Sequence, residues 1–157
     1  MKVPKKIANL KKKAEKKFTP QAIMKHLFDN KEFRKLIIDL NTEDQLFEQG
    51  IDSKGRSLGD YSIATIEGTS NFRGKKQKGQ RYDHITLKDT GDFYRSFRIE
   101  LTGSTFKIVA DGQKEETNLF AEYGIDIIGL TQFNMSVVMS AAVPIIQKYI
   151  KSVLINE

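Results

Sequence analysis

The side chains best suited to acid–base or metal chemistry are few and widely separated. The chain has two histidines, His26 and His84, and no cysteine. His26 has no second ligand four residues further on, which argues against a metal site in its helical segment. Asp83 and His84 are adjacent, and adjacent side chains on a strand point to opposite faces. We therefore predict no catalytic, cofactor-binding or metal-binding residue and no enzymatic activity, with a nuclease as the weakest alternative.

The glycine-containing segments do not match known catalytic or phosphate-binding loops. No Gly-x-Ser-x-Gly turn is present to carry a serine nucleophile. Gly68 and Gly74 are separated by five residues rather than four, and Lys76 stands where a phosphate-binding loop needs Ser or Thr. The segment "DSKGRSLGD", residues 52–60, lacks the alternating oxygen ligands of a calcium loop. These segments are therefore predicted to be surface loops.

Basic residues gather in the segment "GTSNFRGKKQKGQRYDH", residues 68–84. Its aromatic residues Phe72 and Tyr82 flank five cations, which are Arg73, Lys75, Lys76, Lys78 and Arg81. Proteins that bind single-stranded nucleic acid often combine cations and aromatic rings in this way. A flexible loop that becomes ordered on a protein partner would have the same composition. Residues 68–82 are thus a candidate contact with nucleic acid or protein.

The N-terminal segment carries most of the positive charge. The chain of 157 residues has a formal net charge of +6. Residues 1–17 hold eight lysines, among them Lys11, Lys12 and Lys13, against one glutamate, so this segment is +7 and the remainder is −1. Such an arrangement predicts contact with an acidic partner, either nucleic acid or protein. A solubilising, frayed terminus is the alternative.

Periodicity predicts helices in the first third of the chain. Thr19 is a candidate N-cap, and Pro20 suits the first helical position because its missing N–H has no partner there. A second run of apolar residues at helical spacing covers residues 32–40. We expect a break near Asn41, with Thr42 capping the next helix and Gly50 ending it.

The second half predicts a hairpin and a closing helix. Two alternating segments, 97–101 and 106–110, flank a tight turn at Gly103. A short helix is expected before Gly124, and Thr131 is a candidate cap for a final helix. Its expected core-facing stripe is Phe133, Val137, Val138, Ala141, Ile145, Tyr149 and Val153.

These elements predict an α+β fold with N-terminal helices, a long basic loop, an antiparallel hairpin and a long C-terminal helix. We divide the chain into a basic tail, residues 1–17, and a single α+β domain, residues 18–157. No uninterrupted run of 18 apolar residues is present, so no membrane-spanning helix and no membrane partner are expected.

The segment "ITLKDTGDFYRSFRIE" resembles a signature of tailed-phage neck proteins, the tail-completion or virion-morphogenesis family related to head–tail connectors. That signature is leucine, two residues, Thr-Gly, then a hydrophobic residue and a serine at fixed spacing. The matching residues are Leu87, Thr90, Gly91, Phe93, Ser96 and Phe97. In physical terms, Leu87 would end a strand, Thr90 would cap a short helix, and Phe93 and Phe97 would pack on one face. Ser96 could bond back to a carbonyl.

Two flanking segments resemble the same family in the same order. Upstream, the counterparts are Asp52, Gly55, Ser62 and Thr65, although the family's tryptophan position is near Leu58 and the chain has no tryptophan. Downstream, "NLFAEYGIDIIGLT" supplies Tyr123, Gly124 and Gly129. The resemblance covers about residues 46–155. An ordinary turn in an unrelated α+β domain is the alternative.

The resemblance implies a structural virion protein of the head–tail junction, with no cofactor. It would form a homo-oligomeric ring around the DNA channel, between proteins on the connector or portal side and proteins on the tail side. It would lie in the host cytoplasm during assembly and afterwards in the virion neck or tail. The alternative function is a nucleic-acid-binding module that uses the N-terminal lysines and the basic loop.

Overall fold

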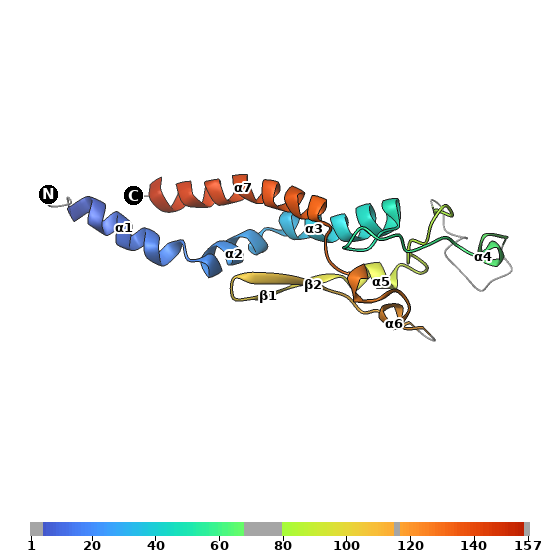
Figure 1. Ribbon diagram of the computed structural model, residues 1–157. Coiled ribbons are helices and arrows are strands. Elements are labelled where there is room, and N and C mark those ends of the chain that lie inside the picture. Colours follow the sequence, from blue (N-terminus) through green and yellow to red (C-terminus); the bar gives the residue numbers. More distant parts are fainter. Residues whose placement is uncertain (1–4, 68–79, 115–116, 156–157) are drawn as a thin grey trace.

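The computed structural model describes residues 5–67, 80–114 and 117–155 and confirms the α+β class. The molecule is elongated, with both termini at one end and α4 at the other (Figure 1). The described helices are α1 (Lys5–Lys17), α2 (Pro20–Asp29), α3 (Lys31–Asp39), the π-helix η1 (Leu40–Gln49), α4 (Ile63–Glu67), α5 (Asp92–Arg95), α6 (Leu119–Tyr123), the 3₁₀-helix η3 (Ile125–Ile127) and α7 (Gln132–Ile155). The described strands are β1 (Arg98–Thr102) and β2 (Thr105–Val109).

Side-chain caps fix the beginnings of α2 and α3. The Thr19 hydroxyl accepts the N–H of Ala22 at 3.1 Å, and Pro20 occupies the first turn, as predicted. Asn30 ends α2 and caps α3, because its side-chain oxygen accepts the N–H of Phe33 at 3.1 Å. One asparagine therefore sets the boundary between two helices.

The expected break near Asn41 is wrong. The chain continues from α3 directly into η1, and Thr42 caps nothing: its hydroxyl donates to the carbonyl of Ile38 at 2.9 Å within the helix. Both Asn41 and Thr42 are buried. The predicted end is confirmed, since Gly50 has φ 61° and ψ 39°, a left-handed conformation that glycine adopts without steric cost.

The hairpin forms as predicted. β1 and β2 pair antiparallel with Ile99 opposite Ile108, and Gly103 turns the chain with φ 62°. Phe97 and Ile108 are buried. The hairpin packs toward α2 and α3, and the Phe28 and Phe106 rings are 4.9 Å apart.

The long helix α7 packs against α1, α2 and α3. Thr131 caps it as predicted, because its hydroxyl accepts the N–H of Asn134 at 3.2 Å. The prediction that Phe133 faces the core is wrong: Phe133 is 73% exposed, whereas Asn134 is 1% exposed. The register of α7 turns the amide inward at this end, and Val138 is the first buried apolar residue of the helix.

One segment has the length and composition of a membrane-spanning helix, contrary to the expectation from the sequence. Ile125–Ile155 meets that test within the described part of the chain, and 17% of its most apolar stretch is buried. The hydrophobic core that one side of α7 joins consists of Leu27, Phe28, Phe33, Ile37, Leu46, Leu87, Phe93, Tyr94, Phe97, Ile108, Leu119, Ile127 and Val138.

Candidate assembly site

The Thr-Gly segment folds as a turn and a short helix rather than as the end of a strand. Leu87 is buried but has φ 58°, and no strand precedes it in residues 80–86. Gly91, not Thr90, is the N-cap of α5, with φ 83°. The Thr90 hydroxyl instead donates to the Asp92 carboxylate and lies 3.4 Å from the Asp92 N–H. The predictions that Leu87 ends a strand and that Thr90 is the N-cap of the short helix are therefore wrong.

The aromatic half of the segment behaves as predicted. The rings of Phe93 and Phe97 are 5.0 Å apart at 71°, an edge-to-face contact. The Ser96 hydroxyl donates to the carbonyl of Phe93 at 2.6 Å and accepts the N–H of Asp111 at 2.9 Å. Phe93 also contacts the ring of Phe120 in α6. These contacts join α5, the hairpin and α6.

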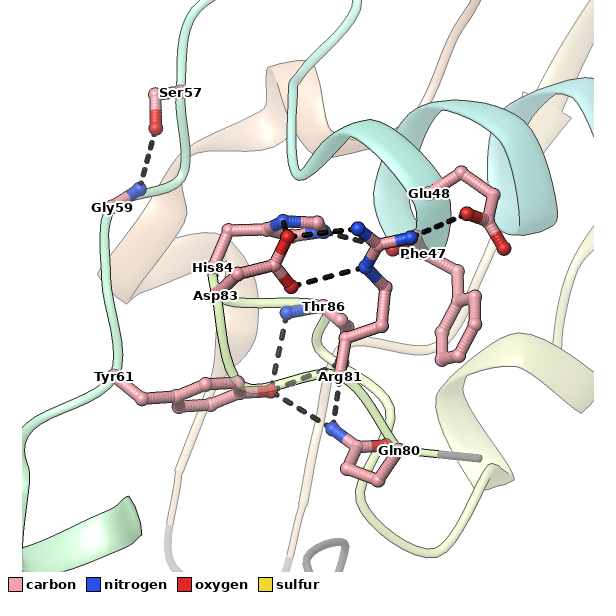
Figure 2. A network of polar contacts seen from close by, with 10 residues as sticks. All are labelled: Phe47, Glu48, Ser57, Gly59, Tyr61, Gln80, Arg81, Asp83, His84 and Thr86. Atoms are coloured by element: carbon pink, nitrogen blue, oxygen red, sulfur yellow. Dashed lines mark hydrogen bonds and ion pairs between the residues drawn. The ribbon is translucent and has the colours of Figure 1, made fainter. Parts of the chain in front are cut away.

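A buried phenol secures the turn before α5. The Tyr94 hydroxyl donates to the carbonyl of Thr86 at 2.5 Å, and Thr86 is fully buried. Burial raises the pKa of Tyr94, so the phenol stays a protonated donor. The Thr86 hydroxyl lies 3.0 Å from the Tyr61 hydroxyl, and the Gln80 amide donates to both (Figure 2).

Arg81 joins the C-terminal end of the basic segment to η1. Its guanidinium donates to Glu48 at 2.5 Å and to Asp83 at 2.8 Å (Figure 2). The hydrogen bond from Arg81 lowers the pKa of the Asp83 carboxyl. His84 Nε2 lies 2.8 Å from the carbonyl of Phe47. We call Glu48, Arg81, Asp83 and His84 the loop clamp.

The other predicted contact residues fall into two groups. Arg73, Lys75, Lys76 and Lys78 lie outside the described residues. Lys11 and Lys12 are exposed on α1, where Lys11 forms an ion pair with Glu15 at 4.0 Å, and the Lys13 side chain lies outside the described part. Residues 5–17 form a helix that contacts α7, and the Tyr149 hydroxyl donates to the carbonyl of Lys17.

The upstream and downstream segments are joined by a buried carboxylate. Asp52 is 3% exposed and accepts the N–H groups of Lys54 and Arg56 and the Arg56 side chain at 2.7 Å. Arg56 also donates to Asp126 at 2.7 Å. The N–H of Ser53 donates to the carbonyl of Asp126. The loop at 52–56 is thereby fixed to η3.

Three buried amides, Asn41, Gln45 and Asn134, form an amide cluster that the sequence pattern does not predict. Asn41 donates to the carbonyl of Ile127 at 3.2 Å and accepts the N–H of Gly129 at 2.8 Å. Gln45 donates to the carbonyl of Gly129 and accepts the N–H of Thr131. The Asn134 amide donates to Gln45, Asp44 and the carbonyl of Leu40. The available signal was a pair of amides, Asn41 and Gln45, four residues apart on one helical face.

The three segments that resemble the neck-protein pattern meet around one cleft of about 470 Å³. Ser62 and Thr65 line it from the upstream segment, Leu87 from the central one, and Tyr123 from the downstream one. Its charged residues are Asp60, Asp89, Glu122 and Lys114. Gly124, with φ 82°, ends α6 beside the cleft, whereas Gly129 lies in the amide cluster.

The cleft has the chemistry of a binding surface. Hydroxyls, phenols, carboxylates and one ammonium group line it, and neither histidine is among the lining residues. Burial and the neighbouring Glu122 raise the pKa of Tyr123, so this phenol stays protonated near neutral pH. In the part of the chain that the structure describes, no three His, Asp or Glu residues come together as a metal site.

No family model, curated protein or solved structure matches the chain. The structure brings residues from all three motif segments together, and it ties those segments to η1 and α7.

Proposed function

We propose that the chain is a structural subunit of the neck of a tailed phage, in tail completion or head–tail joining, without catalytic activity. The observation that carries this proposal is the convergence of the three motif segments around the cleft. Of the motif residues, Ser62, Thr65, Leu87 and Tyr123 line the cleft, so each of the three segments contributes to one surface.

The two ends of the molecule support head-to-tail contacts. The basic helix α1 lies at one end, whereas α4 and α6, which border the cleft, lie toward the other (Figure 1). Three carboxylates and one lysine line the cleft, so its formal charge is −2, opposite to that of α1. Contact between unlike ends is heterologous, and it closes into a ring when the rotation per subunit permits.

Localisation tests the proposal directly. Antibody against the recombinant protein, coupled to gold, would be applied to particles released by the strain that encodes the chain. We expect gold at the head–tail junction, and an antibody against a known capsid protein provides the matched control. Particles without gold, together with the protein in a soluble nucleoprotein fraction, would refute the neck assignment.

A nucleic-acid-binding module is the second candidate, and the exposed lysines of α1 favour it. Lys11, Lys12, Lys16 and Lys17 are all exposed. Such a module would bind DNA with an affinity that falls steeply with salt. Each Lys→Gln change in α1 that leaves one phosphate without its cation would reduce that slope by about one. Binding that is insensitive to salt would eliminate this candidate.

A further inference from the structure

The cleft combines buried apolar residues with exposed carboxylates. Leu87 and Leu119 line it and are buried, whereas Asp60 and Glu122 line it and are exposed. A side chain with an apolar stem and a cationic head can place both of its parts in such a cleft. Lysine has this form, because its ammonium group stands at the end of a flexible aliphatic stem. The lining therefore favours a partner that presents lysines.

Two carboxylates of the cleft have no cationic partner in the described part of the chain. Asp89 is paired with Lys114 at 3.9 Å, so these two charges largely offset each other. Asp60, by contrast, forms no hydrogen bond or ion pair with a described residue. Glu122 is hydrogen-bonded to the phenol of Tyr123, which is neutral and leaves the charge of the carboxylate in place. Asp60 and Glu122 are therefore the groups that an ammonium group entering the cleft would meet.

Lysines of α1 are available in the same way. Lys12 and Lys16 are exposed and four residues apart, so they project from the same side of the helix. Lys11 is paired with Glu15 at 4.0 Å, whereas neither Lys12 nor Lys16 forms an ion pair with a described residue. Because α1 is already helical, presenting these lysines to a partner costs little ordering of the backbone.

The position of α1 keeps it away from the cleft of its own chain. The Tyr149 hydroxyl donates to the carbonyl of Lys17 at 3.0 Å, and the rings of Phe18 and Tyr149 are in edge-to-face contact at 5.7 Å. These contacts hold α1 beside the end of α7, whereas α4 and α6, which border the cleft, lie toward the other end of the molecule (Figure 1). An α1 helix that occupies a cleft must therefore belong to another copy.

We propose that the cleft binds exposed lysines of α1 from a second copy of the chain. The ammonium groups of Lys12 and Lys16 donate to the cleft, where the carboxylates of Asp60 and Glu122 accept. The contact joins unlike ends of two copies, so it is heterologous and repeats from one copy to the next. This inference rests on the proposed function, because it names the contact through which neck subunits would join.

Sedimentation velocity of the purified full-length chain tests the contact. At low salt we expect species heavier than 17.9 kDa that grow with concentration and dissociate as sodium chloride is added, because the contact pairs opposite charges. Lys12→Glu combined with Lys16→Glu should weaken self-association at least about 30-fold. The matched control, Lys75→Glu combined with Lys76→Glu, makes the same change of charge in the basic segment and should leave self-association unchanged. Circular dichroism and urea unfolding confirm that each variant is folded.

An exchange of charges tests which groups meet. Asp60→Lys combined with Glu122→Lys should also prevent self-association, because α1 would then meet a basic cleft. Mixing this variant with the Lys12→Glu, Lys16→Glu variant should restore association, since each helix then finds a cleft of opposite charge in the other variant. The control, Glu32→Lys, reverses an exposed carboxylate on α3 and should associate like the wild type.

Three results would overturn the proposal. The first is a wild-type chain that stays monomeric at low salt up to about 1 mM. The second is a loss of self-association in the Lys75, Lys76 control as large as that in the Lys12, Lys16 variant, which would assign the cleft to the basic segment. The third is a mixture of the two charge-exchanged variants that fails to associate. Gold at the head–tail junction would preserve the neck assignment in each case, so the two failures are distinguishable.

Discussion

The amide cluster and the loop clamp both join η1 to distant segments, but with different chemistry. Asn41 and Gln45 are fully buried, neutral, and bonded to backbone groups 84 to 88 residues away. Glu48 and Asp83 of the clamp are exposed, and their ion pairs with Arg81 face solvent. A buried neutral hydrogen bond cannot be replaced by water, whereas an exposed ion pair can.

This difference separates two tasks. The amide cluster holds residues 127–131, between η3 and α7, against η1 and should contribute strongly to stability. The loop clamp holds the chain against η1 just after residue 80 and should contribute little to global stability. The following predictions, ordered from the largest expected effect to the smallest, test this separation.

Asn41→Leu should cause the largest loss. The substitution keeps the number and branching of the side-chain heavy atoms but removes the hydrogen bonds to the carbonyl of Ile127 and from the N–H of Gly129. We expect a loss of about 3 kcal/mol in the free energy of unfolding, measured with urea. The matched control, Gln49→Leu, lies on the exposed side of the same π-helix and should change stability by less than about 0.5 kcal/mol. Equal losses of stability in Asn41→Leu and Gln49→Leu would contradict the stabilising role of the amide cluster.

Gly50→Ala should cost about 2 kcal/mol, because the left-handed conformation strains an L-residue. A Cβ atom would also lie 2.3 Å from the His84 ring. Gly55→Ala is the control: Gly55 has φ 75° but nothing within 4 Å of a Cβ atom. Thermal unfolding of the two variants therefore separates strain from the clash with the clamp. A loss for Gly50→Ala no greater than that for Gly55→Ala would show that the clash is relieved without cost.

Tyr94→Phe should cost about 1 kcal/mol, because it removes the only hydrogen bond described for the buried phenol, the one to the carbonyl of Thr86. Tyr149→Phe removes an exposed bond to the carbonyl of Lys17 and should cost less. Urea unfolding measures both. If Tyr149→Phe lowered the free energy of unfolding more than Tyr94→Phe, burial would not determine how much these two hydrogen bonds contribute to stability.

Arg81→Gln should leave global stability almost unchanged and should accelerate proteolysis next to residue 80. The substitution removes the hydrogen bonds from the guanidinium to Glu48 and Asp83, but water then solvates both exposed carboxylates. Limited chymotrypsin digestion, with mapping of the cleavage sites, measures the effect, because Tyr82 remains a cleavage site whereas the substitution removes the trypsin site at Arg81. Lys54→Gln, which removes an exposed ion pair to Asp126, is the control and should leave cleavage near residue 80 unchanged.

The clamp also gives a small pH dependence with a defined sign. Arg81 lowers the pKa of Asp83 below its ordinary value of 3.8. Because the folded-state pKa is the lower one, the contribution of Asp83 to stability is present above that ordinary value and is lost as the pH falls below it. Unfolding of Asp83→Asn should therefore approach that of the wild type in acid. A growing difference below pH 4 would contradict the assignment.

Local features could be predicted because each depends on neighbours in the sequence. The Thr19 cap, the left-handed Gly50, the Gly103 turn and the Phe93–Phe97 contact were all predicted within a few residues. The cleft could not be predicted from spacing alone, although the resemblance had placed its three segments in order. Their meeting depends on contacts across many residues.

The errors have a common cause. The break near Asn41 and the cap at Thr42 were inferred from polar residues, which usually lie at the ends of helices. Here the polar groups have partners elsewhere: Asn41 bonds to Ile127 and Gly129, so the helix continues through it. Phe133 was placed in the core by its hydrophobicity, but the amide of Asn134 occupies that position.

The sequence by itself determined the α+β class, the hairpin with its turn at Gly103, and the helix ends at Thr19, Gly50 and Thr131, because caps, glycines and alternation act over a few residues. Only the tertiary structure decided that three buried amides would replace the expected helix break, that the motif segments would surround one cleft, and that one side of α7 would stay exposed. The physical reason is that burying a polar group without a partner is costly, and the partners of Asn41 and Gln45 lie more than 80 residues away.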